Sequence, residues 1–524
     1  MKHTWVRGMR TIAVAASVSA VLAACGGGGT SSTTAGGPTG ELDRAAVLRV
    51  TASAPTRNLD PYLQTSYGGW GYMTPVFDRL TVVDGDGMLQ PALAESWAFA
   101  PDGTYLELKL RSDVTFHDGT PFDAAAVAAN IERGKTMEGS TVVAALEDIT
   151  AVEIVDPHTV RLMLAPGTGV ELPSVFTTNV GMMVSPKAIE SGADLRNDPG
   201  DAGSGAFVVA SYVPEESLTL TRTDGTNWDP EAGKVASIEF QAIPDASTRL
   251  NGVKTGATDL TWVSSANEVV EAQSLGADGT LDVDEVKFRN VLGLFMRAEG
   301  DLANPEARQA VATAIDPDAI NALFSGTCTP HRQVYPDGSW SVDESYVYPY
   351  AYDEEKARGL ADAAGGPTIT LTFAAGTNTE KSANVIQAQL TAAGITAELN
   401  PVPNTQNEPR YIAGDFQSMV SNSLSPKVDP AETVDQFVTG AYDFANDNPQ
   451  IAELAEQAAD PSLSQDERAP LYQQIWDLTL QEAMFVPICN QTNASVSDGT
   501  VAGLDDMPWV DLGIFDVRHV GIVG

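Results

Sequence analysis

Residues 368–402 hold a strand, a helix and a second strand, and this order constrains the fold more than any other stretch of the chain. Residues 368–373 alternate apolar and polar side chains, which is the period of a half-buried strand. The range 380–393 has helical periodicity, and Gly394 predicts a left-handed cap before the strand at 395–402. Two strands joined by a helix of this length predict parallel pairing and an α/β fold.

The first 24 residues have the layout of an export signal. Three basic residues open the chain, and the stretch 11–22 is apolar, uncharged and too short to span a bilayer. The sequence Leu22-Ala23-Ala24-Cys25 resembles a bacterial lipoprotein lipobox. The resemblance implies that residues 1–24 are removed and that Cys25 is lipidated as the new N-terminus. The alternative is an ordinary signal peptide that ends near a cysteine.

A linker follows Cys25. Residues 26–40 consist of Gly, Ser, Thr, Ala and one Pro, which cannot build a core, so we assign residues 25–44 to a lipidated flexible tether. No later stretch approaches the roughly 20 apolar residues of a membrane span. We therefore expect an extracytoplasmic protein that touches the cell membrane only through the lipid on Cys25.

The remaining chain is long enough for two or more domains and strongly acidic. It has 524 residues in all and a formal net charge of −40. Such a surface repels nucleic acid and anionic lipid, so neither is expected as a partner. The sequence contains no P-loop pattern, and we expect a monomer.

Cys328 and Cys489 are left as an even pair once Cys25 is assigned to lipid. In an oxidising compartment an even pair predicts one disulfide. Two buried free thiols are the alternative.

The segment 89–122 carries the most specific pattern. Asp102-Gly103 is a hairpin-turn signal, and the leucines within residues 105–111 then alternate with charged side chains, as in a half-buried strand. Asp123 follows as the expected cap of a helix.

The ordered motifs of this segment resemble those of the extracytoplasmic solute-binding proteins of ABC importers, family 5, the peptide/nickel-binding group. The matching stretches are Pro91–Trp97, Asp102-Gly103 and Phe116–Phe122, with further agreement at Asn58–Pro61, Gly203–Phe207, Ala314–Asp316 and Tyr352–Ala357. The resemblance runs along most of the mature chain. It departs from the family pattern at Ser204, Ala206 and Glu354, where the family has Thr, Pro and Pro.

The resemblance implies an α/β, two-lobed periplasmic-binding-protein-like (type II) fold with an extra subdomain in the first lobe. We expect lobe I to comprise residues 45–88, 203–290 and 492–524, its subdomain residues 89–202, and lobe II residues 291–491. It also implies that the protein captures a small ligand, oligopeptide or another amino-bearing solute, in an interlobe cleft and delivers it to ABC permease subunits.

Three aromatic residues are candidates for the ligand wall. Tyr67 and Trp70 crowd a glycine-rich stretch, which predicts either a ligand wall or the edge of a core. Trp262 follows a turn that looks like the family's Gly-x-x-Asp motif, and the resemblance implies a place at the cleft. Simple packing of Trp262 is the alternative.

Four polar residues complete the candidate ligand contacts. Asp429 matches the family's Asp-Pro and could hold a ligand ammonium, or could merely cap the helix that starts before Ala431. The Trp usual upstream is absent; Asn422 lies in that region, which puts a peptide ligand in doubt. Asn490 and Gln491, at the expected crossover, could donate hydrogen bonds to a ligand.

Catalysis is not expected, and neither is a cofactor or a metal. The histidines show no ligand spacing, and His117 is expected to bond backbone in a turn. The alternatives are a secreted hydrolase, for which no G-x-S-x-G or H-E-x-x-H motif is present, and a surface signalling or chaperone-like protein on the same fold.

Overall fold

The computed structural model describes residues 40–524 except 55, 65–66, 86, 226, 505–506, 508 and 511–513; the side chains of 67–68, 286–289, 509–510 and 514 are also outside the description. The predicted signal, Cys25 and most of the tether therefore lie outside the described residues. All of these described residues belong to one compact unit of the chain.

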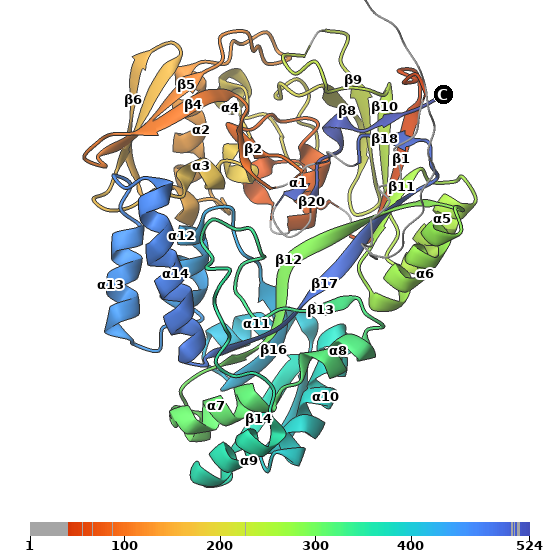
Figure 1. Ribbon diagram of the computed structural model, residues 1–524. Coiled ribbons are helices and arrows are strands. Elements are labelled where there is room, and N and C mark those ends of the chain that lie inside the picture. Colours follow the sequence, from red (N-terminus) through yellow and green to blue (C-terminus); the bar gives the residue numbers. More distant parts are fainter. Residues whose placement is uncertain are drawn as a thin grey trace, which may run out of the picture. The chain divides into compact units, whose positions relative to one another are not determined.

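One mixed sheet runs through this unit, in the strand order β15-β14-β16-β12-β17-β11-β1-β10-β9-β8, with β13 paired to β17 at the side. Its strands are β1 (Val47–Ala52), β8 (Phe207–Val213), β9 (Ser217–Arg222), β10 (Ser237–Ala242), β11 (Leu260–Val263), β12 (Asp282–Met296), β13 (Cys328–Pro330), β14 (Thr368–Ala374), β15 (Thr396–Val402), β16 (Ser418–Leu424) and β17 (Phe485–Ser497). The long antiparallel pair β12 and β17 lies in the middle of this order and connects two lobes (Figure 1).

The pairing of β12 with β17 changes register between the lobes. Lys287 pairs with Thr492, but the next β12 partner is Val291, which pairs with Asn490. Four steps along β12 thus match two along β17, so β12 bulges at this point, and bulges bend a strand. The bulge in β12 therefore lies at the boundary between the two lobes.

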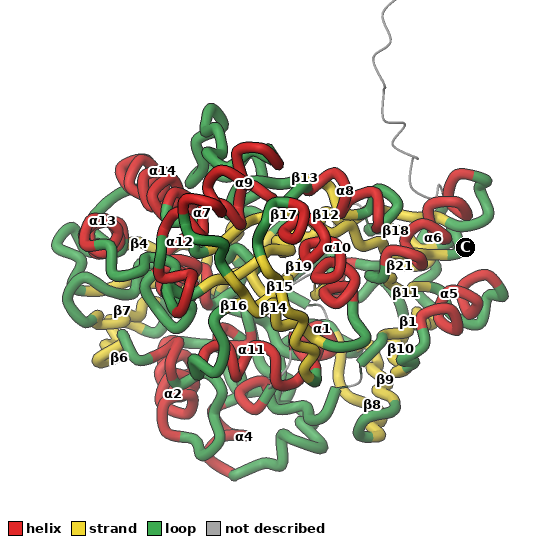
Figure 2. Tube along the Cα trace, turned by 90° about the horizontal axis from the view of Figure 1, so that it is seen from below, coloured by secondary structure: helices red, strands yellow, loops and turns green. Residues whose placement is uncertain are grey.

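Lobe II is built as the sequence predicts. The strands β14, β15 and β16 are parallel. Helix α10 (Asn378–Ala392) connects β14 to β15 and packs on both, and Gly394 ends this connection with a φ of +81°. Helix α11 (Asn404–Ile412) packs on β14 and β16 (Figure 2). The expected strand–helix–strand unit at 368–402 is confirmed to within two residues at each boundary.

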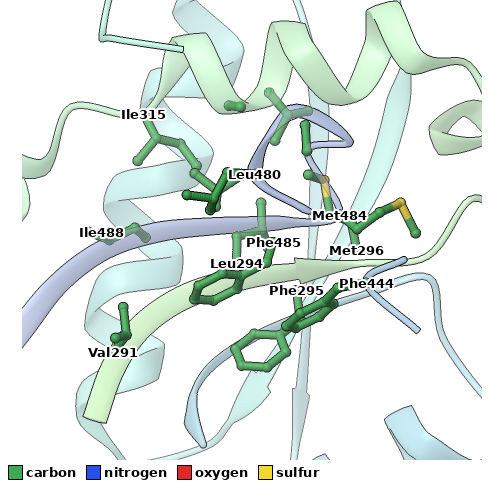
Figure 3. Close-up of a cluster of buried hydrophobic side chains, with 14 of the residues drawn as sticks. Val291, Leu294, Phe295, Met296, Ile315, Phe444, Leu480, Met484, Phe485 and Ile488 are labelled. Atoms are coloured by element: carbon green, nitrogen blue, oxygen red, sulfur yellow. The ribbon is translucent and has the colours of Figure 1, made fainter. Parts of the chain in front are cut away.

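An apolar cluster between the crossing strands and the lobe II helices forms the core of this lobe. Figure 3 shows β12 side chains such as Leu294 and Phe295 packed with Phe485 and Ile488 of β17 and with Leu480 of α14. The remaining lobe II helices are α7 (Pro305–Ala314), α8 (Pro317–Leu323), α9 (Glu354–Ala363), α12 (Pro430–Thr433), α13 (Pro449–Ala458) and α14 (Gln465–Gln481).

Lobe I contains the other half of the large sheet. Here β1 is parallel to both β10 and β11, and β9 and β8 continue in antiparallel fashion. Its helices are α1 (Tyr67–Met73), α5 (Ala246–Lys254) and α6 (Ala266–Ala277), and its short strands are β18 (Val501–Ala502), β19 (Trp509–Val510), β20 (Ile514–Phe515) and β21 (Gly521–Ile522). The C-terminal segment thus completes lobe I.

A separate four-stranded antiparallel sheet has the strand order β4-β5-β7-β6. Leu106, Leu108 and Leu110 of β5 are buried, and Asp123 caps α2 by accepting from the backbone of Ala126, as expected. The elements of this part are β2 (Thr81–Val83), β3 (Leu89–Pro91), β4 (Ala94–Phe99), β5 (Tyr105–Leu110), β6 (Ile149–Asp156), β7 (Thr159–Leu164), α2 (Ala124–Thr136), α3 (Leu172–Val175) and α4 (Pro186–Ser191).

A buried ionic network fastens the C-terminal segment to the N-terminal one. Arg79 and Asp516 form an ion pair in which both side chains are completely buried. Asp516 also accepts from Arg518, which lies 3.6 Å from Asp78. Arg79 and Asp516 are 437 residues apart in the sequence, so this network joins the first and the last segments of lobe I.

Candidate ligand-binding site

The carboxyl ends of the parallel strands in both lobes point toward the crossing of β12 and β17. In lobe II, β16 runs toward the crossing, because its last residue, Leu424, pairs with Val291 beside the register shift. In lobe I, β11 also runs toward it, because Val263 pairs with Ala494 whereas Leu260 pairs with Ser497, farther along β17. Ligands of open α/β sheets bind at the carboxyl ends of the strands, so this junction is the candidate site.

Three of the predicted contacts come together at the crossing in a cluster of amides. Asn422 Nδ2, on β16, donates to Gln491 Oε1 at 3.2 Å. Asn490 Nδ2 donates to the Asn290 carbonyl at 3.4 Å, and Asn290 Nδ2 donates to the Asn422 carbonyl at 3.1 Å. The exposed Asn422 and half-buried Gln491 leave amide groups within reach of a bound molecule.

Asn290 is a member of this cluster that the sequence analysis missed. Its side chain is 7% exposed, and its Oδ1 has no hydrogen-bond partner among the described residues. A buried acceptor without a donor costs free energy, so Asn290 is a place where a ligand or water could supply the donor. The only signal for it was its position directly before the apolar run at 291–296.

A second missed residue is Glu408, on the helix that follows β15. The half-buried Glu408 accepts hydrogen bonds from the hydroxyl of Tyr442 and from Ser423 Oγ, the latter at 3.2 Å. Burial raises the pKa of this carboxyl, and the Ser423 hydroxyl partly offsets the shift. Ser423 directly follows Asn422 at the end of β16, and successive side chains of a strand point to opposite faces, so Glu408 stands at the same carboxyl edge but on the other face from the Asn422 amide.

The aromatic candidates lie in lobe I. Trp70 and Trp262 are both partly buried and pack against the same apolar cluster, which includes Tyr72 and Phe240. The ring of Trp262 lies 3.5 Å from that of Phe515, centroid to centroid. Trp262 precedes Val263 at the carboxyl end of β11, so it stands at the edge of the candidate site. The backbone of Tyr67 begins α1, but its side chain lies outside the described residues.

Asp429 is engaged within the chain. Its Oδ1 accepts from the backbone of Ala431 at 2.9 Å, so it caps α12, the alternative that the sequence left open. Arg468 donates to both carboxylate oxygens, at 2.6 and 2.9 Å. A ligand ammonium would have to compete with this bidentate guanidinium, which counts against Asp429 as a ligand contact.

Cys328 and Cys489 are joined by a disulfide, with their Cα atoms 5.3 Å apart. Cys489 directly precedes Asn490, and Cys328 pairs with Gln491 across β13 and β17. The disulfide therefore holds β13 against the strand that carries half of the amide cluster.

The described residues offer no metal centre. His117 Nε2 contacts the Gly205 carbonyl at 2.8 Å, and its backbone N–H donates to Gly203, which is the expected role of a turn histidine. No group of three or more His, Cys, Asp or Glu side chains in this part of the chain could hold a metal ion. In the same part, none of the helices has both the length and the apolar character needed to cross a bilayer.

Two α/β lobes, joined by a pair of crossing strands toward which their carboxyl edges point, define the class of two-lobed binding proteins. The chain belongs to the bacterial extracellular solute-binding proteins, family 5, whose middle region matches residues 88–476. The resemblance seen in the sequence is thereby confirmed. This is a family of solute-binding receptors rather than enzymes, and it places the protein outside the cytoplasm.

Curated relatives and solved structures agree with this assignment. The chain is 25% identical over 477 residues to the glutathione-binding protein GsiB of Salmonella paratyphi A, which covers 86% of this chain and 90% of that protein. It has the fold of NikA from Brucella suis in complex with Fe(III)-EDTA, with a TM-score of 0.77, 22% identity and coverage of 91% and 100% of the two chains. It likewise has the fold of DppA from Helicobacter pylori in complex with the peptide STSA, with a TM-score of 0.74, 21% identity and coverage of 92% and 98%.

Proposed function

We propose that this protein captures an oligopeptide or another amino-bearing solute at the junction of its lobes and delivers it to an ABC permease. The observation that carries the proposal is the meeting of the two carboxyl edges at the crossing strands, where Asn422, Asn490 and Gln491 form an amide cluster and Trp262 lies next to the end of β11. The relatives support the ligand class, since one binds glutathione and another is solved with a peptide.

The side chains at the junction suit a ligand with both donors and acceptors. The amides of Asn422, Asn490 and Gln491 can bond to the peptide groups of a ligand, and Glu408 can accept from its ammonium. Trp262 and Trp70 supply apolar surface for the rest of the ligand. A bound solute would touch both lobes, and so would favour their closed arrangement.

Mass spectrometry of material released from the purified protein tests this proposal. The full chain is isolated in detergent without denaturation and then unfolded, and the released compounds are weighed. We expect a peptide or an amine-bearing compound in stoichiometric amount. Release of a sugar, or of a solute without an amino group, would contradict the ligand class.

Variants at the junction then locate the site. Asn422→Ala and Trp262→Ala are expected to weaken binding of the released compound by about tenfold, because each removes roughly 1–2 kcal/mol of contact. Tyr352→Ala removes an aromatic side chain that is 44% exposed in lobe II and serves as the control, with no change expected. Equal binding by all three variants would place the ligand elsewhere.

We also propose that a lipid on Cys25 holds the mature protein at the cell membrane as a monomer. The support is the lipobox-like sequence before Cys25 and the linker after it. Cys25→Ser is expected to move the protein from the membrane fraction into the soluble extracytoplasmic fraction. Membrane association that survives this substitution would contradict a lipid on Cys25.

A further inference from the structure

Gln491 lies on β17 at the point where the two crossing strands are out of register. The residues before and after it pair with β12, but Gln491 itself has no registered partner there, because it faces the β12 bulge. The short strand β13 pairs with the same stretch of β17, and in that pairing Cys328 stands opposite Gln491. Within the described part of the chain, Cys328 is therefore the only registered strand partner of Gln491.

A disulfide attaches this partner strand to β17. Cys328 is bonded to Cys489, two residues before Gln491, and the Cα atoms of the two cysteines are 5.3 Å apart. Next to the disulfide, the backbone N–H of Thr492 donates to the Thr327 carbonyl at 2.8 Å. A strand of three residues forms few ladder hydrogen bonds, so the covalent bond adds a restraint that the pairing alone supplies only weakly.

The disulfide lies on the same face of the sheet as the side chain of Gln491. Side chains alternate along a strand, and residues paired across antiparallel strands share a face, so Cys328 is the direct neighbour of Gln491. From this position Gln491 Oε1 accepts a hydrogen bond from Asn422 Nδ2 at 3.2 Å, on β16 beyond the intervening β12. A shift of β13 and β17 would therefore move one member of an amide pair at the candidate ligand site.

Both cysteine side chains are completely buried. Cys328 and Cys489 are each 0% exposed, so thiol reagents and redox partners do not reach them in the folded protein. The disulfide therefore forms most readily before this part of the chain folds, and folding then protects it. In the folded, oxidised protein the restraint on Gln491 is permanent.

We propose that the disulfide is a positioning element of the ligand site, which holds Gln491 where it contacts the solute, so that only the oxidised protein binds tightly. In its formation two thiols lose two electrons and two protons, one S–S bond forms, and a disulfide-bearing oxidant is reduced to its dithiol. A chain that still carries both thiols, as in a reducing compartment, binds the solute weakly. The proposal rests on the proposed function, because it assumes that a solute binds at the junction of the lobes.

Hydrogen–deuterium exchange of the full chain tests the positioning without any ligand. In the double variant Cys328→Ser, Cys489→Ser, we expect a loss of protection at the backbone amides of residues 327–331 and 489–492. The amides of β14, at 368–374, serve as the internal control and should change far less. Unchanged protection at 489–492, or an equal loss in β14, would overturn the proposal.

Calorimetric titration with the compound released from the wild-type protein then tests binding, at a temperature where circular dichroism shows each variant folded. The double cysteine variant should bind about tenfold more weakly, and so should Gln491→Ala, which keeps the disulfide. Combining all three substitutions should again cost about tenfold rather than about a hundredfold, because the changes act through one side chain. Additive losses, or wild-type affinity in Gln491→Ala, would overturn the proposal.

Asp516→Asn is the matched control for stability. Asp516 belongs to the buried ionic network of lobe I, away from the amide cluster, so its substitution should leave the affinity within about twofold of the wild type. Equal weakening in Asp516→Asn and in the cysteine variant would assign the effect to general stability and overturn the positioning role. A wild-type protein that binds no released compound would instead contradict the proposed function.

Discussion

At the scale of single residues, charged side chains occur in two environments, the acidic surface and a buried ionic network in lobe I. On the surface, the excess of acidic groups keeps the molecule soluble and repels other anions. Inside lobe I, Arg79, Asp516, Arg518 and Asp78 are buried together. Breaking such a buried pair leaves an uncompensated charge, so individual members of this network control stability although none touches the candidate ligand site.

Asp516→Asn is expected to lower the free energy of unfolding by about 3–5 kcal/mol, because it leaves Arg79 and Arg518 without their carboxylate. Burial alone would raise the pKa of Asp516, but Arg518 and Arg79 hold it well below its usual range. This stabilisation is therefore present above about pH 4 and is lost as the pH falls further. Urea unfolding of both proteins at pH 7 and at pH 3 measures it.

The control for this substitution is Asp224→Asn, since Asp224 is an exposed loop carboxylate. It should change the unfolding free energy by less than about 0.5 kcal/mol. If Asp516→Asn and Asp224→Asn unfold alike, the network contributes little to stability.

At the scale of elements, the crossing strands demand close packing. Gly293 lies on β12, and a Cβ built there would be 2.3 Å from Phe485 Cε2 and 2.8 Å from the Val486 carbonyl. Gly293→Ala should therefore force the strands apart and destabilise the protein by about 1–3 kcal/mol. Gly359→Ala in α9, where a Cβ meets nothing within 4 Å, should instead stabilise it by about 0.5–1 kcal/mol. Thermal unfolding of the two variants should shift the midpoint in opposite directions.

The disulfide between Cys328 and Cys489 is a second constraint on the crossing strands, because it ties β13 to β17. It joins positions 161 residues apart, and closing a loop of this length in the unfolded chain contributes about 3–5 kcal/mol in the chain-entropy model. The double substitution Cys328→Ser, Cys489→Ser should lower the unfolding free energy by this amount. Adding a reductant should then lower the stability of the wild type but not that of the variant. Equal sensitivity of both proteins to the reductant would contradict a stabilising role.

Elements that depend on local periodicity were predictable from the sequence, whereas features that depend on pairing between distant residues were not. The unit at 368–402 follows from alternation, helical spacing and Gly394, all of which act within a few residues. The strand β12 begins at Asp282, nine residues before the predicted start of lobe II at 291, because its first half is held by pairing with β17 about 200 residues away. Likewise, Arg468 is 39 residues from Asp429 in the sequence, and no local pattern around Asp429 indicates that the two form an ion pair.

The candidate site shows the same division. Asn422, Asn490 and Gln491 were found because motif order and the expected crossover point to them. Glu408 was missed because it belongs to no motif; it matters only because α11 starts at the carboxyl edge of the sheet, beside the end of β16. Applying the carboxyl-edge rule to the predicted parallel strands would have directed attention to the residues after Val402.

At the scale of the whole molecule, separate apolar cores are joined by few elements. The lobe II cluster draws its members from residues 291–489, apart from Ala266, whereas lobe I and its subdomain have clusters of their own. In such an arrangement the crossing strands, together with side-chain contacts such as that of Ser174 with Glu432, connect the lobes. The unliganded protein is therefore expected to unfold in two calorimetric transitions, since cooperativity weakens where contacts are few.

A ligand that touches both lobes should change this behaviour. At 100 times its Kd, the ligand stabilises the folded form by about 2.7 kcal/mol. Because a ligand held by Asn422 in lobe II and by Trp262 in lobe I binds only when both lobes are folded, it should raise both transitions and merge them into one. Scanning calorimetry with the compound released from the purified protein measures this. A ligand that raises one transition and leaves the other in place would locate the binding site within a single lobe, and would contradict a site at the junction.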